Sequence, residues 1–231
     1  MYICIQNIIN DSINLFYSPY CLLLIFLCFV LGSIPFGLII SYISGYGDIR
    51  KLGSGNIGAT NVLRTGNKSL ALFTLIADLS KGFLAIYISN LFLEDSISIE
   101  LLAYLYSFTA IAVVFGHMFS PWLKFKGGKG VATSSGILIF ICWPCFIMSL
   151  IIWILFAIST KKSSIGGLLS SLSAPVFLWS LYQMNKIGLP FPIPSINFIE
   201  ILAITVIVVF IWIKHNQNIQ RIFKKKEPKI S

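Results

Sequence analysis

The sequence predicts an all-α, polytopic integral membrane protein, built as a bundle of about seven helical segments. Apolar residues make up 57% of the 231 residues and charged residues only 11%, whereas charged residues are about a quarter of an ordinary soluble domain. The mean hydropathy is +0.88, and the apolar residues fall into long runs. These features exclude a disordered chain and a soluble nucleic-acid-binding protein.

Each apolar run predicts one helix, with one exception. A membrane-spanning helix needs about 20 apolar residues, and backbone groups in lipid must be hydrogen-bonded within the segment. No sustained alternation of apolar and polar residues suggests a membrane barrel. The expected helices cover 20–43, 70–92, 101–119, 163–182 and 198–213, and the exception is the uncharged run 131–158. No internal repeat is visible, so residues 1–231 are expected to form a single membrane domain with a short basic tail at 217–231.

The basic residues indicate which helix ends face the cytoplasm. Most of the 17 Lys and Arg residues fall in four segments, 50–68, 124–129, 161–162 and 214–229. Acidic residues mark the opposite ends, at Glu94, Asp95, Glu100 and Glu200. Cytoplasmic loops of membrane proteins are enriched in Lys and Arg, so the four basic segments are predicted to be cytoplasmic. The N-terminus is then outside and the C-terminus cytoplasmic.

The run 131–158 is predicted to fold back on itself. It separates two basic segments, and a single crossing would place Lys161 and Lys162 outside. Pro144 disfavours helical structure at the residue before it. The expected hairpin has helices at 131–141 and 145–158, each about 15–20 Å long, with a turn near Pro144. The alternative is one tilted helix of 28 residues.

The first cytoplasmic loop carries residue types suited to binding phosphate. Glycines allow tight turns and close backbone approach, and an arginine offers a two-pronged donor for phosphate oxygens. The relevant residues are Gly53, Ser54, Gly55, Asn56, Gly58, Thr60, Asn61 and Arg64. An ordinary loop with Gly and Asn as turn formers is the alternative interpretation.

The second loop surrounds a lysine with glycines just before a predicted helix. Backbone N–H groups at a helix N-terminus bind anions, and a nearby lysine adds a positive charge. The residues are Gly127, Gly128, Lys129, Gly130 and Thr133. The spacing is not that of a Walker A loop. A flexible basic turn that meets anionic lipid headgroups is the alternative.

The C-terminal segment adds His215 and Asn218, which are one helical turn apart and share a face. On the predicted topology this segment emerges on the same side as both glycine-rich loops. Three polar segments that meet at one cytoplasmic face indicate a phosphorylated substrate next to the membrane.

These three segments resemble the motifs of the PlsY family, which are bacterial membrane glycerol-3-phosphate acyltransferases. The resemblance lies in Gly53-Ser-Gly-Asn-Ile-Gly-Ala-Thr-Asn61, Gly127-Gly-Lys-Gly-Val-Ala-Thr133 and His215-x-x-Asn-Ile219. Further similarities are Gly32-Ser-Ile-Pro-Phe-Gly37, Asp78-x-x-Lys-Gly82 and Gly116-His117. The resemblance covers the chain from about residue 31 to the tail.

The resemblance implies transfer of a fatty acyl group from acyl phosphate to the 1-hydroxyl of sn-glycerol 3-phosphate, without cofactor or metal. The products are lysophosphatidic acid and phosphate, in the first step of phospholipid synthesis. It also implies a bacterial inner-membrane enzyme with a cytoplasmic active site and an upstream acyl-phosphate-forming enzyme as a partner.

The family motifs also imply roles for individual residues. The catalytic residues are Ser54, Arg64, Lys129, His215 and Asn218. The substrate-binding residues are Gly53, Gly55, Asn56, Thr60, Asn61, Gly127, Gly128, Gly130, Thr133 and Ser164. Ser163 is the alternative to Ser164, and Glu227 corresponds to a structural glutamate. His215 is either a general base or a donor to phosphate, since the substrate phosphate can itself take the proton.

Two further features have competing interpretations. Asp78 and Lys81 lie three residues apart in a predicted helix and are expected to pair inside the bundle. Cys142 and Cys145 form a CxxC, which is either a redox pair or two small apolar side chains. A transporter for a phosphorylated anion is the main alternative to an acyltransferase.

Overall fold

The computed structural model describes residues 18–93, 99–188 and 195–230, and within these ranges every regular element is a helix. The predicted all-α class is therefore confirmed. The α-helices are α2 (Pro19–Ser33), α3 (Phe36–Ile43), α4 (Ala59–Leu63), α5 (Lys68–Leu93), α6 (Ile99–Met118), α7 (Val131–Ile141), α8 (Trp143–Thr160), α9 (Ser163–Lys186), α10 (Phe198–Lys214) and α11 (Asn216–Phe223). Two short 3₁₀ helices cover Ile49–Lys51 and Pro121–Leu123.

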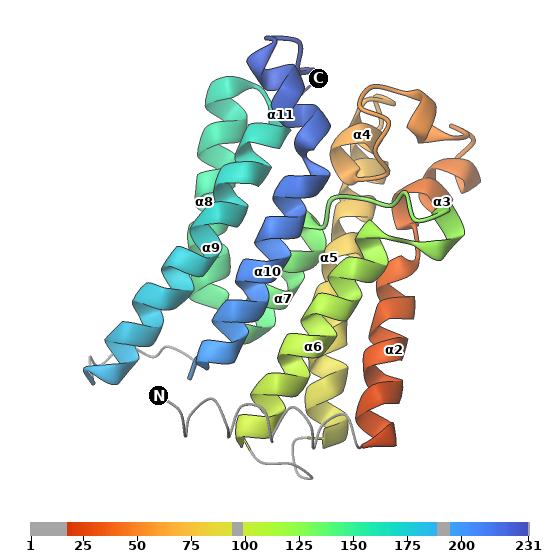
Figure 1. Ribbon diagram of the computed structural model, residues 1–231. Coiled ribbons are helices and arrows are strands. Elements are labelled where there is room, and N and C mark those ends of the chain that lie inside the picture. The colour runs from red at the N-terminus through yellow and green to blue at the C-terminus, as the bar shows by residue number, and fades with distance from the viewer. Residues whose placement is uncertain (1–17, 94–98, 189–194, 231) are drawn as a thin grey trace.

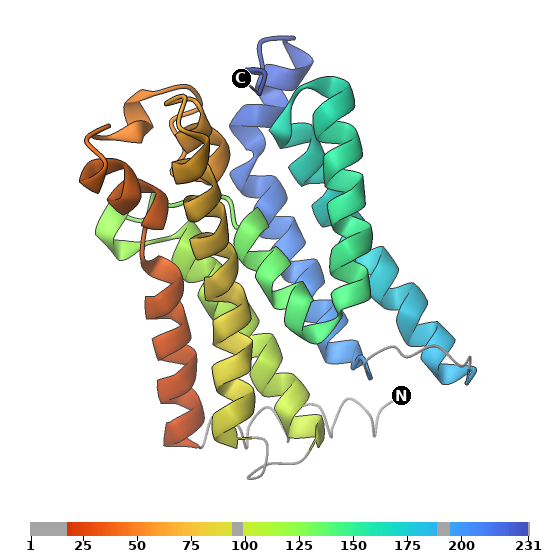
Figure 2. The same cartoon turned by 180° about the vertical axis from the view of Figure 1, so that it is seen from behind.

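The long helices run side by side in two groups, as Figures 1 and 2 show. One group contains α2, α5 and α6, the other α8, α9 and α10. The short helix α7 lies between the groups and contacts α5, α6, α8 and α10. At one end of the bundle α4, α11 and the C-terminal residues lie together (Figure 1). This end carries the polar segments singled out in the sequence.

The bundle is an integral membrane structure. Among the described residues, four helices are long and apolar enough to cross a membrane, and six spans result if each of two bent helix pairs counts as one. Large apolar side chains such as Phe26, Phe73 and Leu155 are exposed on the outer faces, as expected where lipid replaces water. The predicted external N-terminus and the acidic residues Glu94 and Asp95 lie outside the described residues.

The first apolar run is two helices rather than one. α2 ends at Ser33, α3 begins at Phe36, and the axes bend by 41°. Pro35 causes this break because it lacks an N–H and disfavours helical backbone at the residue before it. The carbonyl oxygens of Gly32 and Ile34 at the break accept hydrogen bonds from Lys81.

The predicted fold-back of 131–158 is confirmed, with two unequal arms (Figure 1). α7 has 11 residues and α8 has 18, so their lengths are about 16 and 27 Å at 1.5 Å per residue. The second arm was predicted to start at 145 and to be short; it starts at Trp143 and is long enough to cross a membrane. Pro144 sits in its first turn, where no N–H donor is required.

Glycines set the closest helix crossings. An added Cβ would lie 2.0 Å from the Val113 carbonyl oxygen at Gly32 and 2.1 Å from the Phe29 carbonyl oxygen at Gly116, so only glycine permits the α2–α6 crossing. α5 and α7 meet in the same way through Gly82 and Gly136. Small residues at membrane helix interfaces allow backbones to approach closely. The α5–α7 crossing fixes the start of α7 beside the first polar loop.

Candidate active site

One cavity of about 580 Å³ joins the three polar segments. All five predicted catalytic residues line it, namely Ser54, Arg64, Lys129, His215 and Asn218. Of the predicted substrate-binding residues, Asn56, Thr60, Asn61, Gly130 and Ser164 also line it, whereas Gly53, Gly55, Gly127, Gly128 and Thr133 do not. The four glycines of the second group lie in the loops, and Thr133 is buried in α7.

Asn61 organises the first loop. Its side-chain oxygen accepts hydrogen bonds from the Ser54 N–H at 3.1 Å, the Ser54 hydroxyl at 3.3 Å and Nη1 of Arg64 at 2.9 Å. Its Nδ2 donates to the Ile49 carbonyl oxygen at 2.7 Å. Asn61 is 1% exposed, so a buried amide holds the serine and the arginine at fixed positions.

The absence of a side chain at Gly53 leaves room for the Arg64 side chain. Gly53 has φ +50°, and an added Cβ would lie 2.5 Å from Cδ of Arg64. Glycine adopts this left-handed backbone without steric cost. Within the described residues, Nε and Nη2 of Arg64 have no hydrogen-bond partner, so they are available to an anion. Burial lowers the pKa of the Arg64 guanidinium from its ordinary value, and it remains charged at neutral pH.

The second loop is pressed against the end of α6. The Gly127 N–H donates to the Met118 carbonyl oxygen at 3.1 Å, and the Gly128 N–H donates to that of His117 at 2.9 Å. An added Cβ on Gly127 would lie 2.1 Å from the His117 carbonyl oxygen. These glycines therefore serve close packing, which the lipid-headgroup alternative did not explain.

The start of α7 supplies the free backbone donors of this loop. Gly130 is the N-cap, and the first hydrogen bond that its carbonyl accepts comes from the Ser134 N–H. Within the described residues, the N–H groups of Gly130, Val131 and Ala132 have no hydrogen-bond partner, and these residues line the cavity. A helix N-terminus with free N–H groups attracts anions.

Lys129 is held by a chain of polar side chains from the C-terminal segment. Its Nζ donates to Oδ1 of Asn218 at 2.5 Å, and Nδ2 of Asn218 donates to Glu227 at 2.6 Å. Arg221 pairs with the other carboxylate oxygen of Glu227 at 2.9 Å. Burial lowers the pKa of Lys129 to about 8, an effect opposed by the nearby Glu227 carboxylate. Glu227 thus anchors the tail against the site.

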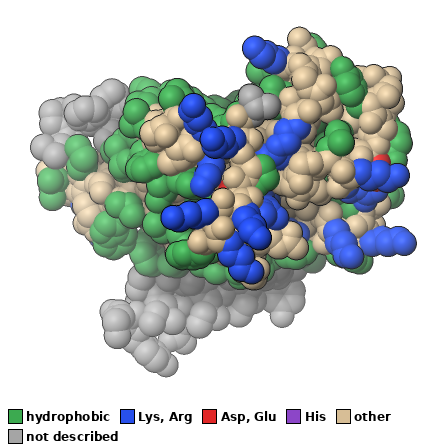
Figure 3. All heavy atoms as spheres, turned by 90° about the horizontal axis from the view of Figure 1, so that it is seen from above, with side chains coloured by type: hydrophobic (Ala, Val, Ile, Leu, Met, Phe, Trp, Pro, Cys, Tyr) green, Lys and Arg blue, Asp and Glu red, His purple; other side chains and the backbone are tan. Residues whose placement is uncertain are grey.

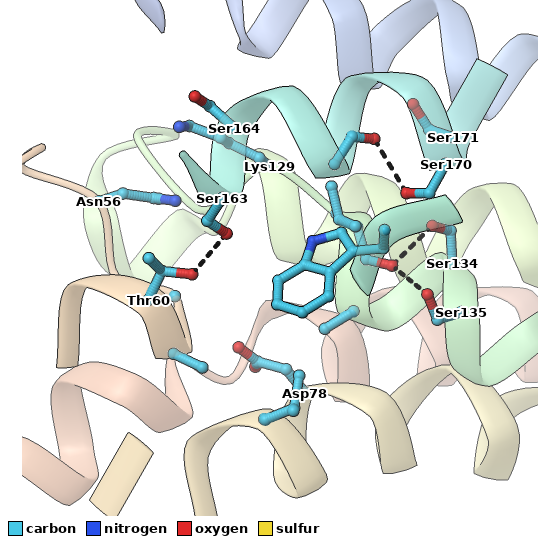
Figure 4. Close-up of a pocket in the computed structure, with 18 of the residues that line it drawn as sticks. Asn56, Thr60, Asp78, Lys129, Ser134, Ser135, Ser163, Ser164, Ser170 and Ser171 are labelled. Carbon is cyan, nitrogen blue, oxygen red and sulfur yellow. Dashed lines mark hydrogen bonds between the residues drawn. The ribbon is translucent and has the colours of Figure 1, made fainter. Parts of the chain in front are cut away.

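Serines from α9 complete the polar end. The hydroxyls of Thr60 and Ser163 are hydrogen-bonded at 2.9 Å, which joins α4 to the start of α9. Ser164 is buried next to Glu227. Figure 4 shows Thr60 and Ser163 facing each other, with Lys129 and Ser164 nearby. Both serines line the cavity. The two alternatives that the sequence offered for the phosphate-binding serine, Ser163 and Ser164, therefore both lie at the site.

His215 presents an acceptor to the cavity. It lies between α10 and α11, and its Nδ1 is 2.8 Å from the Ile211 carbonyl oxygen. A carbonyl oxygen only accepts, so Nδ1 carries the proton and Nε2 of the neutral ring has a lone pair. A Cβ added at Gly167, which also lines the cavity, would lie 3.7 Å from this Nε2.

The deeper part of the cavity is apolar. Its lining residues there include Leu75, Leu79, Leu138, Phe146, Leu150, Trp153, Ile204, Ile207 and Val208, from α5, α7, α8 and α10. Sequence reasoning missed the hydroxyls of Ser134, Ser135, Ser170 and Ser171, which line the wall and donate to carbonyl oxygens of their own helices (Figure 4). In 163–174 the small residues recur every three to four positions. That period indicates one helix face and would have revealed the α9 wall.

The surface around the cavity is basic. Figure 3, viewed from the end that carries the C-terminus, shows Lys and Arg side chains gathered on this face. Among the described residues, no three His, Cys, Asp or Glu side chains lie close enough to hold a metal ion. Cys142 and Cys145 are buried free thiols, and neither lines the cavity.

Sequence comparisons find close relatives of this chain. A family model described as glycerol-3-phosphate acyltransferase matches residues 22–225. A glycerol-3-phosphate acyltransferase of Gluconobacter oxydans (strain 621H) is 41% identical over 209 residues, which are 90% of this chain and 92% of that protein. A protein of the same name from Ehrlichia canis (strain Jake) is 42% identical over 204 residues, 88% of this chain and 95% of that protein.

Solved structures agree with these relatives. A crystal structure of PlsY, described as an integral membrane glycerol 3-phosphate acyltransferase in its glycerol 3-phosphate form, matches with a TM-score of 0.76 and 29% identity, covering 92% of this chain and 96% of that chain. The lysophosphatidic acid form of PlsY matches with a TM-score of 0.75 and 29% identity, covering 91% and 95%.

Proposed function

The chain belongs to the glycerol-3-phosphate acyltransferase family and acylates glycerol 3-phosphate, and we propose that its acyl donor is an acyl phosphate. A fatty acyl group passes to the 1-hydroxyl of sn-glycerol 3-phosphate. The products are lysophosphatidic acid and inorganic phosphate. Both substrates of this reaction carry a phosphate, and one also carries a long apolar chain.

The observation that carries the proposal is the continuity of one cavity from a cationic end to an apolar slot. Arg64, Lys129 and the first N–H groups of α7 meet at the cationic end. Beyond the polar end the slot follows α9 from Gly167 to Ala174, a length of about 10 Å at 1.5 Å per residue. An extended chain advances roughly 1.2 Å per bond, so this part of the slot accommodates about eight bonds of a fatty chain.

The reaction depends on positioning the two substrates and on neutralising the charge of their phosphates more than on a strong general acid or base. The glycerol hydroxyl oxygen bonds to the carbonyl carbon, the bond from that carbon to the phosphate oxygen breaks, and the electron pair leaves with inorganic phosphate. An acyl phosphate is a mixed anhydride, so no ATP, cofactor or metal drives the transfer. Fixed cations at the phosphates stabilise the charge that develops as the bond breaks.

We assign separate roles to the polar residues. Arg64 and Lys129 bind phosphate oxygens, Ser164 donates its hydroxyl, and Ser54 donates its hydroxyl to the substrate after turning away from Asn61. Asn61 and Asn218 act through their neighbours, because their hydrogen bonds fix Arg64 and Lys129. His215 accepts the hydroxyl proton at Nε2, since its Nδ1–H is engaged with Ile211. The glycines Gly53, Gly55, Gly127 and Gly128 shape the loops, and Thr133 packs inside α7.

The setting of the reaction follows from charge and chemistry. The basic face is cytoplasmic on the positive-inside rule, which places the proposed site on the cytoplasmic side of the bacterial inner membrane, within a single domain over residues 1–231. Because an acyl phosphate hydrolyses readily, a separate acyl-phosphate-forming enzyme must supply it. Membrane lipids surround the apolar faces.

A donor comparison tests this proposal. Purified protein is given labelled glycerol 3-phosphate with either palmitoyl phosphate or palmitoyl-coenzyme A, and labelled lysophosphatidic acid is measured. We expect product with palmitoyl phosphate, and a loss of at least about 10²-fold in Ser54→Ala and Arg64→Ala. Product from the thioester alone, or full activity in Arg64→Ala, would contradict the proposal.

A further inference from the structure

A buried charged cluster lies beside the proposed site and has no part in the roles assigned so far. It consists of Asp78 and Lys81 on α5 and His117 on α6, all of them 5% exposed or less. Nζ of Lys81 is 2.9 Å from Oδ1 of Asp78 and 3.1 Å from Nδ1 of His117. Asp78 and His117 line the cavity, and Figure 4 places Asp78 across it from Thr60 and Ser163.

Lys81 has three hydrogen-bond contacts through Nζ and a separate ion pair with Asp78. It donates to the carbonyl oxygens of Gly32 at 3.1 Å and Ile34 at 2.8 Å, which lie at the helix break before Pro35. Carbonyl and carboxylate oxygens only accept hydrogen bonds from a lysine. A carboxylate in contact compensates the buried ammonium charge. Lys81 is therefore present as the ammonium ion.

This arrangement fixes the tautomer of His117. An ammonium donates, so Nδ1 of His117 accepts and the ring proton resides on Nε2. The opposite tautomer has no acceptor for an Nδ1–H, because the Asp78 oxygen is 3.7 Å away, beyond hydrogen-bond length. The two histidines of the chain thus present opposite groups at Nε2: a lone pair on His215 and an N–H on His117.

Nε2 of His117 lies beside the second loop, and His117 itself lines the cavity. An added Cβ on Gly128 would lie 2.0 Å from Nε2, so the ring edge abuts the backbone just before Lys129. Within the described residues this nitrogen has no hydrogen-bond partner. The atom is not among the fully buried unpartnered ones of the described residues, so an acceptor on a substrate in the cavity can reach it.

We propose that His117 is a further, uncharged donor in the site, whose Nε2–H binds an oxyanion of the substrate near the N-terminus of α7, with Asp78 and Lys81 as the positioning pair. This inference rests on the proposed function. The oxyanion belongs either to the phosphate of glycerol 3-phosphate or to the carbonyl oxygen of the acyl donor as it becomes negatively charged. The shared chemistry is an N–H donor to oxygen.

An activity-independent measurement tests the tautomer. In protein labelled with ¹⁵N-histidine, nitrogen–proton correlations show which ring nitrogens are protonated, and the His215→Gln variant assigns the remaining signals to His117. We expect the proton on Nε2 for His117 and on Nδ1 for His215, and a shift of the His117 Nε2–H signal on adding glycerol 3-phosphate or a non-reactive acyl phosphonate. A proton on Nδ1 of His117, or no shift with either probe, would overturn the inference. These measurements need no catalytic turnover. Their outcome is therefore independent of whether the acyl donor is an acyl phosphate.

Kinetics distinguish the two oxyanions. His117→Gln keeps an amide N–H near the place of Nε2, whereas His117→Leu removes the donor. We expect kcat/KM to fall about 10²-fold in the leucine variant and much less in the glutamine variant, since one oxyanion donor contributes on this scale. A raised KM for glycerol 3-phosphate identifies its phosphate as the acceptor, and a lowered kcat with unchanged KM identifies the carbonyl oxygen. Equal activities of the two variants would contradict donation by His117.

The positioning pair has its own readout. The double variant with Asp78→Asn and Lys81→Met removes both charges together, so no single buried charge is left unpaired. We expect the His117 ring to become a mixture of tautomers, with a fall in kcat/KM similar to that of His117→Leu. Retention of a pure Nε2–H tautomer would show that the pair does not set it.

Discussion

At the scale of single residues, Asn61 links the loop backbone to the functional groups. One amide oxygen accepts from both Ser54 and Arg64, while the amide nitrogen donates to Ile49. The amide therefore converts a flexible glycine-rich loop into a fixed arrangement of a hydroxyl and a guanidinium. The sequence indicated this asparagine as a substrate contact, whereas its geometry is that of a positioning residue.

We expect Asn61→Ala to lower kcat/KM by about 10²-fold, because Ser54 and Arg64 both lose the acceptor that orients them. The matched control is Asn216→Ala, since Asn216 is exposed at the start of α11 and should retain full activity. Steady-state kinetics with both substrates varied measure the effect. Equal activities of the two variants would contradict the positioning role.

Lys129 should give the reaction a pH dependence. Burial lowers its pKa to about 8, so the side chain is cationic below this pH and neutral above it, while the substrate phosphate stays doubly charged. The KM for glycerol 3-phosphate should therefore rise as pH increases through about 8. Lys129→Arg keeps its charge throughout, and its KM should not rise. A parallel rise in both proteins would exclude Lys129 as the titrating group.

At the scale of helices, the sequence predicted those features that depend on local signals. The lengths of the apolar runs predicted most of the helices. The basic segments at 124–129 and 161–162 predicted the fold-back between α7 and α8. Pro35 and Pro144 mark the two breaks, although the first was read as part of one run. The break near Pro144 was predictable because basic segments lie on both sides of its run, whereas the run that contains Pro35 has basic residues on one side only.

The contacts between helices could not be read from hydropathy. Which faces meet depends on glycine crossings such as Gly82 and Gly136, which bring α5 against α7 through residues distant in the sequence. Charge placed the five catalytic candidates on one face of the membrane, whereas the serine-lined wall of α9 was signalled only by the spacing of small residues in 163–174. Charge patterning locates a site, whereas packing decides which side chains enter it.

A graded glycine series tests the packing account. An added Cβ would lie 1.9 Å from a backbone oxygen at Gly136, 2.7 Å from one at Gly166, and 3.5 Å from the nearest side-chain atom at Gly167. We expect Gly136→Ala to be the most destabilising, Gly166→Ala intermediate, and Gly167→Ala neutral or slightly stabilising because alanine favours helix. Thermal unfolding in detergent measures the order. A Gly136→Ala variant as stable as Gly167→Ala would contradict the assigned crossing.

Cysteine labelling tests the fold-back. Single cysteines replacing Lys126 and Lys162 should both react with a membrane-impermeant thiol reagent from the cytoplasmic side, because α7 and α8 return the chain to the same face. The wild-type protein serves as the control, since its described cysteines are buried. Labelling of the two positions from opposite sides would support a single crossing.

At the scale of the whole molecule, two helix groups flank one cavity that opens at the basic end of the bundle. The net charge and the cavity shape are both consistent with acyl transfer from an acyl phosphate to glycerol 3-phosphate. The formal charge of +9 is concentrated on the face where phosphorylated substrates are expected (Figure 3), and the apolar slot continues from that face between α5, α7, α8, α9 and α10.

The most direct test of the central claim is the stoichiometry of the reaction in one vessel. Protein reconstituted in liposomes receives palmitoyl phosphate and glycerol 3-phosphate, and phosphate release and lysophosphatidic acid are followed together, with Arg64→Ala as the inactive control. The account predicts one phosphate released per lysophosphatidic acid formed, with neither product above background in the control. Phosphate release without lysophosphatidic acid, or acylation without phosphate release, would contradict acyl phosphate as the donor.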